Sequence, residues 1–197
     1  MQPKTSDLDH LQWLKDLGCD SFQNVSVLDV GCGTGFVCHE AMRQGARRAV
    51  GLDIVEPAGL TSNSNWKFIN GDLNSDVWTS GVGEGKFDLI LAFDILEHLD
   101  SPYRFLKTLR ECMDTSGKLV LTTPNLTSWE RYAKPTSWSG VQDDQHKTLF
   151  SRYSLRFLLS KVGFDCVVLK APLRSLGGLG PLVPQIGGQI VCVAKKA

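Results

Sequence analysis

Glycine and carboxylate residues cluster in one short stretch of this 197-residue chain, residues 27–35, where an apolar run passes directly into three alternating glycines. Glycine permits positive φ angles and lets a ligand approach the main chain without a Cβ in its way. The helical pattern that begins at Phe36 would offer free N–H groups and a positive dipole end to an anionic group. The stretch therefore predicts a nucleotide-like ligand over the end of a first strand. Its candidate ligand contacts are Asp29, Gly31, Cys32, Gly33, Thr34 and Gly35.

The spacing of these glycines differs from two common nucleotide-binding loops. A dinucleotide-binding fingerprint requires a third glycine three positions after the second, and that position holds Phe36. A phosphate-binding P-loop requires Lys followed by Ser or Thr, and the turn has neither. Phe36 therefore disfavours an NAD(P)-dependent oxidoreductase.

Two further carboxylates stand at the ends of predicted strands. Asp53 ends the apolar segment 48–53, 20 residues beyond Gly33. A carboxylate there can accept hydrogen bonds from both ribose hydroxyls of a ligand at the first turn. Asp72 follows the strand pattern of residues 67–70, where a single aspartate is more often a turn or helix-cap residue. Three such signals in the right order favour a ligand-binding edge over a purely structural turn.

Alternating strand and helix patterns must position these residues. We expect strands at about 25–30, 48–53, 66–70, 86–93, 118–123, 164–171 and 188–195, and helices at about 7–17, 35–44, 102–113 and 151–162. Such alternation predicts a parallel α/β sheet with right-handed crossovers. The last strand follows its predecessor without a helix, so we expect it to run antiparallel. We expect no full helix between residues 54 and 65.

The chain length predicts a single domain, residues 1–197, with a helical lead-in at residues 1–24. The connection 124–149 is far longer than usual and carries three large aromatic residues and His146, so we expect it to be a substrate loop. A second loop, residues 172–187, is rich in Gly, Pro and Leu. It could cap a pocket, meet a lipid-like substrate or mediate dimerisation.

Composition narrows the partners and the compartment. Lys plus Arg equal Asp plus Glu at 21 each, and no basic run stands out, so we expect no nucleic-acid partner. The six cysteines lack zinc-ligand spacing. Several fall in strand or helix patterns, where a free cysteine behaves as a small hydrophobic residue, and this favours a reducing, cytoplasmic environment. We see no signal peptide and no bilayer-spanning run, and therefore expect no stable membrane insertion. Monomer and homodimer both remain open.

Together these motifs resemble the class I S-adenosylmethionine (AdoMet)-dependent methyltransferases over essentially the whole chain. They are most similar to the small-molecule branch that includes the ubiquinone-biosynthesis O-methyltransferases, through Phe87-Asp88-Leu89-Ile90, Ile95-Leu96-Glu97-His98-Leu99, Thr123-Pro124-Asn125, and residues 146–150 before Gly163-Phe164. The resemblance implies a Rossmann-like seven-stranded sheet of order 3-2-1-4-5-7-6 with helices on both faces. It also implies AdoMet as the cofactor, S-adenosylhomocysteine (AdoHcy) as the product, and a small-molecule acceptor. The further cofactor contacts that it implies are Ile54, Gly71, Asp72, Leu73, Phe93 and Asp94, with Asp72 meeting the adenine amino group.

Histidines are the natural general bases for methyl transfer to oxygen, because the acceptor hydroxyl must lose a proton near neutral pH. We expect His146 to be the base, with His98 as the second candidate. Both belong to segments at the carboxyl edge of the sheet, where open α/β sheets bind ligands. His10 and His39 fall on predicted helices, and we expect them at the surface.

The segment that contains His98 also has the residue types of a metal site. Asp94, Glu97 and His98 share one helical face and could hold Mg²⁺ or Zn²⁺. In the quinone-biosynthesis relatives a similar acid-x-x-Glu-His group is implicated in metal binding. Here Asp94 replaces the first glutamate, and we expect no metal.

Other functions stay open beside an O-methyltransferase of small molecules. A nucleic-acid methyltransferase acting on an exocyclic amine would carry an Asn-Pro-Pro-Tyr type motif, whereas Asp94 begins Asp-Ile-Leu-Glu. A protein methyltransferase and a non-catalytic AdoMet-binding protein are the remaining alternatives. The intact carboxylates of Asp53 and Asp72 argue against a decayed, non-catalytic site. The sequence does not identify the acceptor.

Overall fold

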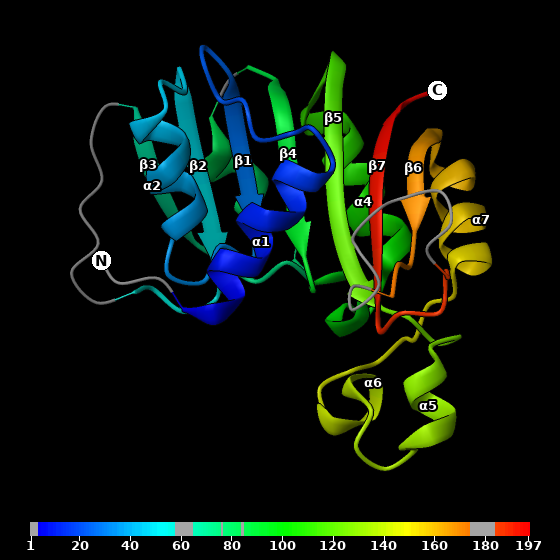
Figure 1. Ribbon diagram of the computed structural model, residues 1–197. Coiled ribbons are helices and arrows are strands. Elements are labelled where there is room, and N and C mark those ends of the chain that lie inside the picture. Colours follow the sequence, from blue (N-terminus) through cyan, green and yellow to red (C-terminus); the bar gives the residue numbers. More distant parts are fainter. Residues whose placement is uncertain (1–3, 58–64, 76, 84, 174–183) are drawn as a thin grey trace.

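A seven-stranded sheet forms the centre of the computed structural model, which describes residues 4–57, 65–75, 77–83, 85–173 and 184–197 (Figure 1). The strands are β1 (Ser26–Val30), β2 (Arg48–Asp53), β3 (Trp66–Asn70), β4 (Phe87–Phe93), β5 (Met113–Pro124), β6 (Phe164–Lys170) and β7 (Gln189–Lys196). They lie in the order β3-β2-β1-β4-β5-β7-β6, and β7 runs antiparallel to both of its neighbours. This order and the direction of β7 confirm the predicted sheet.

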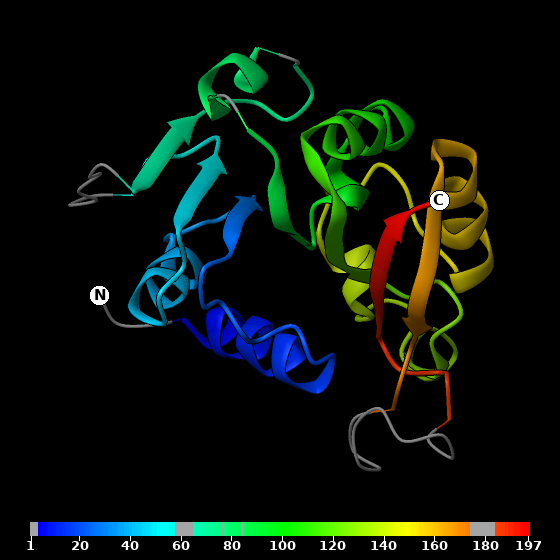
Figure 2. The ribbon, with the colours of Figure 1, turned by 90° about the horizontal axis from the view of Figure 1, so that it is seen from above.

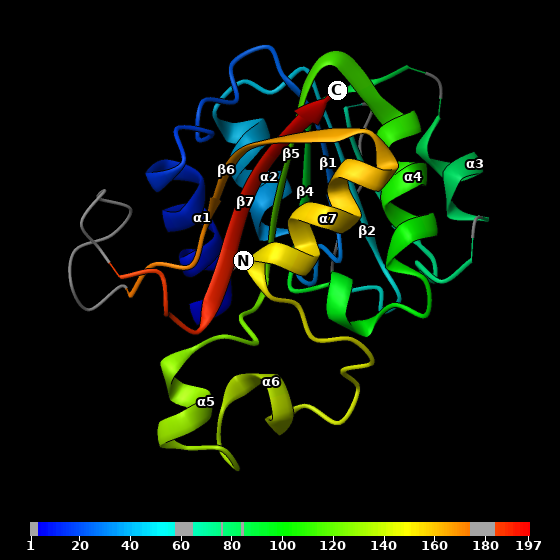
Figure 3. The ribbon, with the colours of Figure 1, turned by 90° about the vertical axis from the view of Figure 1, so that its right-hand side faces the viewer.

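Helices cover both faces of the sheet (Figure 3). One face carries α1 (Thr5–Asp16) and α2 (Phe36–Arg43), and the other carries α3 (Trp78–Val82), α4 (Pro102–Cys112) and α7 (Arg152–Val162). Side chains of β4 alternate between the two sides: Leu89 and Leu91 join one buried cluster, whereas Ile90 and Ala92 join the other. Figure 2 shows the twist of the sheet between α1 and α4. No helix in the described ranges is long and apolar enough to cross a membrane.

The connection between β5 and α7 is not an extended loop. It contains two short helices, α5 (Trp129–Ala133) and α6 (Ser139–Gln142), and Figure 1 places them below the sheet, at the end toward which β1, β2 and β4 point. The two ends of the connection meet, because the Leu126 N–H donates to the Phe150 carbonyl at 2.7 Å. The Asn125 N–H donates to the Gly188 carbonyl at 2.8 Å, which ties the same base to the start of β7.

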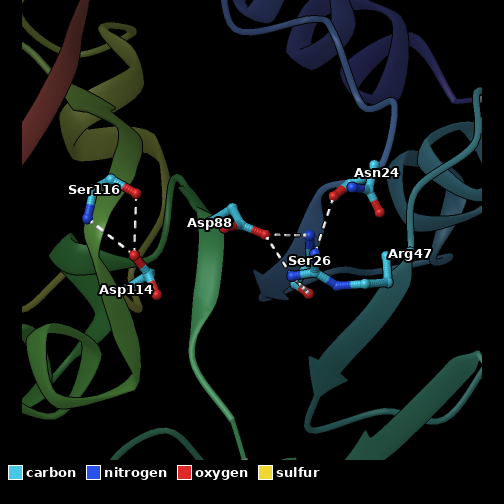
Figure 4. A network of polar contacts seen from close by, with 6 residues as sticks. All are labelled: Asn24, Ser26, Arg47, Asp88, Asp114 and Ser116. Atoms are coloured by element: carbon cyan, nitrogen blue, oxygen red, sulfur yellow. Dashed lines mark hydrogen bonds and ion pairs between the residues drawn. The ribbon is translucent and has the colours of Figure 1, made fainter.

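A polar network closes the opposite end of the sheet (Figure 4). Asp88 accepts hydrogen bonds from the Ser26 N–H at 2.7 Å and from Arg47 at 3.0 Å, so one carboxylate links the starts of β1, β2 and β4. Structural polar residues therefore occupy the amino ends of the parallel strands, while the candidate ligand residues occupy the carboxyl ends.

Two predictions fall wholly or partly outside the described residues. The helix-poor segment 54–65 includes residues 58–64, and the apolar loop 172–187 includes residues 174–183.

Candidate active site

The glycine turn, residues 31–35, leaves β1 and wraps toward the end of β2. The N–H groups of Gly31 and Cys32 both donate to the Leu52 carbonyl, at 2.7 and 3.0 Å. Gly31 has φ +78°, and a Cβ at this position would collide with the side chain of Ile95. Gly33 has φ +52°, and the position of its missing Cβ faces open space with no described heavy atom within 4 Å. A side chain at position 33 would therefore occupy room that a ligand can use.

Asp53 joins the glycine turn directly. Its Oδ2 accepts a hydrogen bond from the Gly33 N–H at 2.8 Å, and its Oδ1 accepts one from the Val55 N–H at 3.1 Å. A carboxylate has about four acceptor directions, so two bonded N–H groups leave capacity for ribose hydroxyls. The carboxylate thus orders the turn as well as offering a ligand contact.

A cavity of about 540 Å³, here called the donor cavity, opens beside this turn. The predicted residues that line it are Gly31, Asp53, Ile54, Gly71, Asp72, Leu73, Asp94 and His98. Residues that were not predicted as ligand contacts complete the lining: Asn74, Ile95, Leu99, Asp144, Gln145 and Lys147. Asp72 also accepts a hydrogen bond from the Asn74 N–H at 2.9 Å, so it shapes its own turn at the cavity wall.

A smaller hollow of about 110 Å³ lies on the other side of the turn, under α1. Predicted lining residues are Asp29, Gly31, Cys32, Gly33 and Thr34, and the unpredicted ones are Lys4, Ser6, Asp7, His10 and Val37. Within the described residues, Gly35 and Phe93 line neither hollow. Gly35 instead takes φ +75° before α2, and Phe93 is buried.

Asp29 is buried in the floor of this hollow. Burial raises the pKa of its carboxyl to about 7, and the charges of Asp53 and Asp7 act in the same direction. The Cys38 thiol, 3.9 Å away, opposes the shift by donating a hydrogen bond to the carboxylate. A cationic group of a ligand would favour the charged form of Asp29.

Asp94 is held from three sides at the end of β4. It has φ +51°, a conformation that costs energy for a non-glycine residue and persists where the surroundings enforce it. Its Oδ1 accepts hydrogen bonds from the Thr122 hydroxyl at 3.0 Å and from the Gln189 amide. Its Oδ2 lies 4.0 Å from Nε2 of His10. Strand β5, strand β7 and helix α1 therefore meet at this carboxylate.

The expected surface position of His10 and His39 is wrong. The His10 ring stacks on Phe93 with 4.3 Å between ring centroids and 14° between planes, and burial lowers the pKa of its imidazole despite the nearby charge of Asp94. His39 packs against Trp66 at 5.3 Å. The sequence does carry a signal for the buried position of His10: it lies three residues from both Asp7 and Trp13, so the three residues share one helical face.

Helix α1 buries a polar residue and exposes an apolar one. Asp7 is buried, whereas the Leu8 side chain is 53 % exposed. The Asp7 carboxylate accepts hydrogen bonds from the Lys4 N–H at 2.7 Å and from the Thr34 hydroxyl at 3.3 Å. These bonds allow a charged residue to face the glycine turn.

His98 and His146 meet at the edge of the donor cavity, with 4.7 Å between their ring centroids. Backbone bonds bring them together: the N–H groups of Lys147 and Thr148 donate to the Glu97 carbonyl at 2.8 and 3.1 Å. Nδ1 of His146 lies 3.1 Å from the Gly140 carbonyl. Because a carbonyl can only accept, Nδ1 is the donor in this contact, and Nε2 is the ring nitrogen left for other partners; it lies 4.0 Å from Oδ2 of Asp143.

Glu97 lies beneath the two imidazoles and is fully buried. Its Oε2 accepts a hydrogen bond from the Thr123 hydroxyl at 2.9 Å, while its Oε1 has no hydrogen-bond partner in the described structure. Burial, followed by the charge of Asp94, raises the pKa of Glu97 to about 8. One ligand atom each from Glu97, His98 and His146 lie within 4.8 Å of one another, so this trio could hold a divalent cation. Asp94 takes no part in this trio, in contrast to the grouping considered from the sequence.

Comparison with known proteins identifies the family. A family model described as a methyltransferase domain matches residues 8–169. A tRNA U34 carboxymethyltransferase from Histophilus somni is 32 % identical over 124 residues, which are 57 % of this chain and 39 % of that protein. A mitochondrial ubiquinone biosynthesis O-methyltransferase from Dictyostelium discoideum is 26 % identical over 119 residues, 53 % of this chain and 37 % of that protein. The chain thus spans about two fifths of the length of these curated relatives.

Solved structures share the fold. An AdoMet-dependent methyltransferase from Archaeoglobus fulgidus has a TM-score of 0.70 at 18 % identity, covering 98 % of this chain and all of that one. The 1,6-didemethyltoxoflavin-N1-methyltransferase from Burkholderia thailandensis, solved with AdoHcy bound, has a TM-score of 0.62 at 19 % identity, with 94 % of this chain and 75 % of that one covered. With the glycine turn, Asp53 and the donor cavity in place, the chain belongs to the methyltransferase-domain family.

Proposed function

We propose that this enzyme transfers the AdoMet methyl group to an oxygen of a small-molecule acceptor, with His146 and His98 as its catalytic imidazoles. The observation that carries the proposal is the imidazole pair beside the donor cavity, with Nε2 of His146 available to take a proton. We further propose that the predicted cofactor contacts that line the two hollows serve AdoMet, including Asp53 at the ribose and Asp72 at the adenine, and that Gly35 and Phe93 support them without lining either hollow in the described structure. All six cysteines are free thiols, which supports a cytoplasmic location.

Methyl transfer from AdoMet depends mainly on how the enzyme orients the methyl donor and the acceptor. The acceptor oxygen attacks the methyl carbon, the carbon–sulfur bond breaks, and its electron pair stays on sulfur as the sulfonium becomes a neutral thioether. The acceptor proton passes to an imidazole nitrogen. Positioning both reactants can supply on the order of 7–11 kcal/mol of the barrier in the best cases, and a general base typically adds about 10²–10⁴-fold.

The charges around the site support a small molecule over RNA. Several carboxylates surround the site: Asp94 and Asp144 line the donor cavity, Asp143 lies beside His146, and Glu130 lines a neighbouring cavity. Lys147, which also lines the donor cavity, forms an ion pair with Asp100 at 2.7 Å. Carboxylates repel a phosphate backbone, whereas RNA-binding proteins present cations to it. The similarity to the Dictyostelium O-methyltransferase supports oxygen as the acceptor atom. The similarity to tRNA U34 carboxymethyltransferases makes a tRNA substrate the second candidate.

Glu97, His98 and His146 fit a small divalent cation, because one ligand atom of each lies within 4.8 Å of the others and one oxygen of the buried Glu97 has no partner in the described structure. When bound, such an ion would act as a Lewis acid toward the acceptor oxygen.

A transfer experiment with two substrate pools tests the acceptor class. The enzyme is incubated with methyl-labelled AdoMet and either a protein-free small-metabolite extract or total tRNA. We expect label in the small-metabolite pool and background counts in tRNA. Label in tRNA alone would contradict the proposal and favour the second candidate.

A buried carboxylate with a raised pKa predicts how stability depends on pH. The folded pKa of Asp29 is about 7, above the ordinary aspartate value near 4. The folded state therefore holds this proton more tightly, and its stabilising effect is full below about pH 4 and lost as pH rises to 7. Asp29→Asn should remove a dependence of up to about 1.4 kcal/mol per pH unit across this window. Thermal unfolding of both proteins without cofactor from pH 4.5 to 8.5 measures it, and identical slopes would refute the assignment.

A further inference from the structure

A second cavity, of about 470 Å³, lies between α1, α5, α6 and the start of β7. Its volume is in the range of small-molecule sites. The cofactor contacts described above lie elsewhere. The lining residues that bear on its chemistry are Trp13, Trp129, Glu130, Ser139, Leu173 and Gln189.

Gln189 connects this cavity to the donor cavity. It lines the second cavity, and its side-chain amide donates to Oδ1 of Asp94, which lines the donor cavity. Helix α1 makes a second connection, because His10 contacts Asp94 and Trp13 lies three residues further along the same helical face. A molecule in the second cavity that contacts Gln189 is therefore one hydrogen bond away from Asp94 of the donor cavity.

The walls have an unusual combination of aromatic rings and one carboxylate. The Trp13 indole is buried, and the Trp129 indole is 42 % exposed at the opening. The Glu130 carboxylate packs against the backbone of Gly188: a Cβ atom added to Gly188 would lie only 3.1 Å from Oε2 of Glu130. In the described structure no Lys or Arg forms an ion pair with Glu130. Indole rings and a carboxylate that has no cation partner among the described residues are complementary to a flat, positively charged ligand.

We propose that this cavity is the acceptor site, and that it selects a planar aromatic acceptor carrying a protonated amine, with the ring between the tryptophans and the ammonium on Glu130. The inference rests on the proposed function, since it presupposes methyl transfer from the donor cavity. The ring's hydroxyl points past Gln189 toward the methyl group. The new carbon–oxygen bond forms there as the carbon–sulfur bond breaks and its electron pair stays on sulfur, and the hydroxyl proton passes to Nε2 of His146, the base of the proposed function.

Three matched probes test the charge preference: tyramine carries an ammonium, 4-ethylphenol is neutral, and 4-hydroxyphenylacetate is an anion. Each is titrated by calorimetry into the full-length enzyme saturated with AdoHcy. We expect tyramine to bind roughly ten-fold tighter than 4-ethylphenol, and the anion to bind most weakly. This order of affinities is measured on the unaltered protein, so the test does not depend on whether a variant folds. Equal binding of tyramine and 4-ethylphenol, or preference for the anion, would overturn the proposal.

Variants test whether Glu130 causes the preference for the positively charged ligand. Glu130→Gln should reduce tyramine binding roughly ten-fold, to the level of 4-ethylphenol, while leaving 4-ethylphenol binding unchanged. Glu111→Gln, at an exposed position on α4, is the matched control and should change neither. Trp129→Ala should weaken tyramine and 4-ethylphenol alike. A Glu130→Gln variant that binds AdoHcy normally and keeps the tyramine preference would refute the assignment. Failure of the unaltered enzyme to bind AdoHcy would instead refute the proposed function.

Discussion

Replacing His146 with alanine should lower turnover with the natural acceptor by roughly 10²–10⁴-fold, the range for loss of a general base. The imidazole lies against His98 at the edge of the donor cavity, and its Nδ1 proton is engaged by the Gly140 carbonyl. Nε2 is therefore the nitrogen that can take the acceptor proton. AdoMet affinity should change little, because His146 does not line the donor cavity among the residues the structure describes. Single-turnover kinetics and calorimetry of the same preparation measure both quantities.

His39→Ala provides a matched control, since it removes an imidazole that packs on Trp66, away from the donor cavity. It should retain turnover wherever the protein is folded. His98→Ala separates the two candidate bases, and the larger loss identifies the proton acceptor. Full turnover of the His146→Ala protein between pH 6 and 9 would contradict its role, and proximity or His98 would then explain the rate.

Asp53→Ala should weaken AdoMet binding by roughly 1.5–3 kcal/mol, about ten-fold to more than a hundred-fold. Two effects contribute. The ribose loses a charged acceptor, and the Gly33 N–H loses its 2.8 Å partner, which loosens the glycine turn. Asp53→Asn should lie between, because an amide oxygen can still accept from Gly33 but carries no charge.

Asp114→Ala is the control for this series. Asp114 bonds Ser116 at the far end of the sheet, among the residues of Figure 4, and its removal should leave AdoMet affinity unchanged. Calorimetric titration with AdoMet at fixed pH measures all three variants. Wild-type affinity in a folded Asp53→Ala protein would remove Asp53 from the cofactor site.

Local sequence patterns were sufficient for the sheet and for most of the donor cavity. Parallel strands place their carboxyl ends at one edge, so a strand that ends in Asp53 and a glycine turn after β1 must come together wherever the sheet forms. The direction of β7 followed from the missing crossover helix. These features depend on periodicity and on the residue at each strand end, and both are visible in sequence.

Contacts between distant segments were not predictable in the same way. His10 was assigned to the surface because it falls on a predicted helix, whereas hydrogen bonds to Asp7 turn a polar face of that helix inward. Gln189 reaches Asp94 across 95 positions, through the placement of β7 beside β5. The trio of Glu97, His98 and His146 forms because backbone bonds tie residues 147 and 148 to Glu97. The contact of Gln189 with Asp94 and the approach of His146 to Glu97 have no local signature.

Carbon-13 NMR of the methylated product tests the central claim most directly. The enzyme is supplied with AdoMet labelled with ¹³C at the transferred methyl and with a small-metabolite extract, and the products are examined without separation. The chemical shift of a methyl carbon distinguishes attachment to oxygen from attachment to nitrogen, sulfur or carbon. We predict a single dominant methyl–oxygen signal that appears with the wild-type enzyme and fades by roughly 10²-fold or more with His146→Ala. A methyl–nitrogen or methyl–carbon signal, or a methyl–oxygen signal undiminished in the variant, would contradict the account.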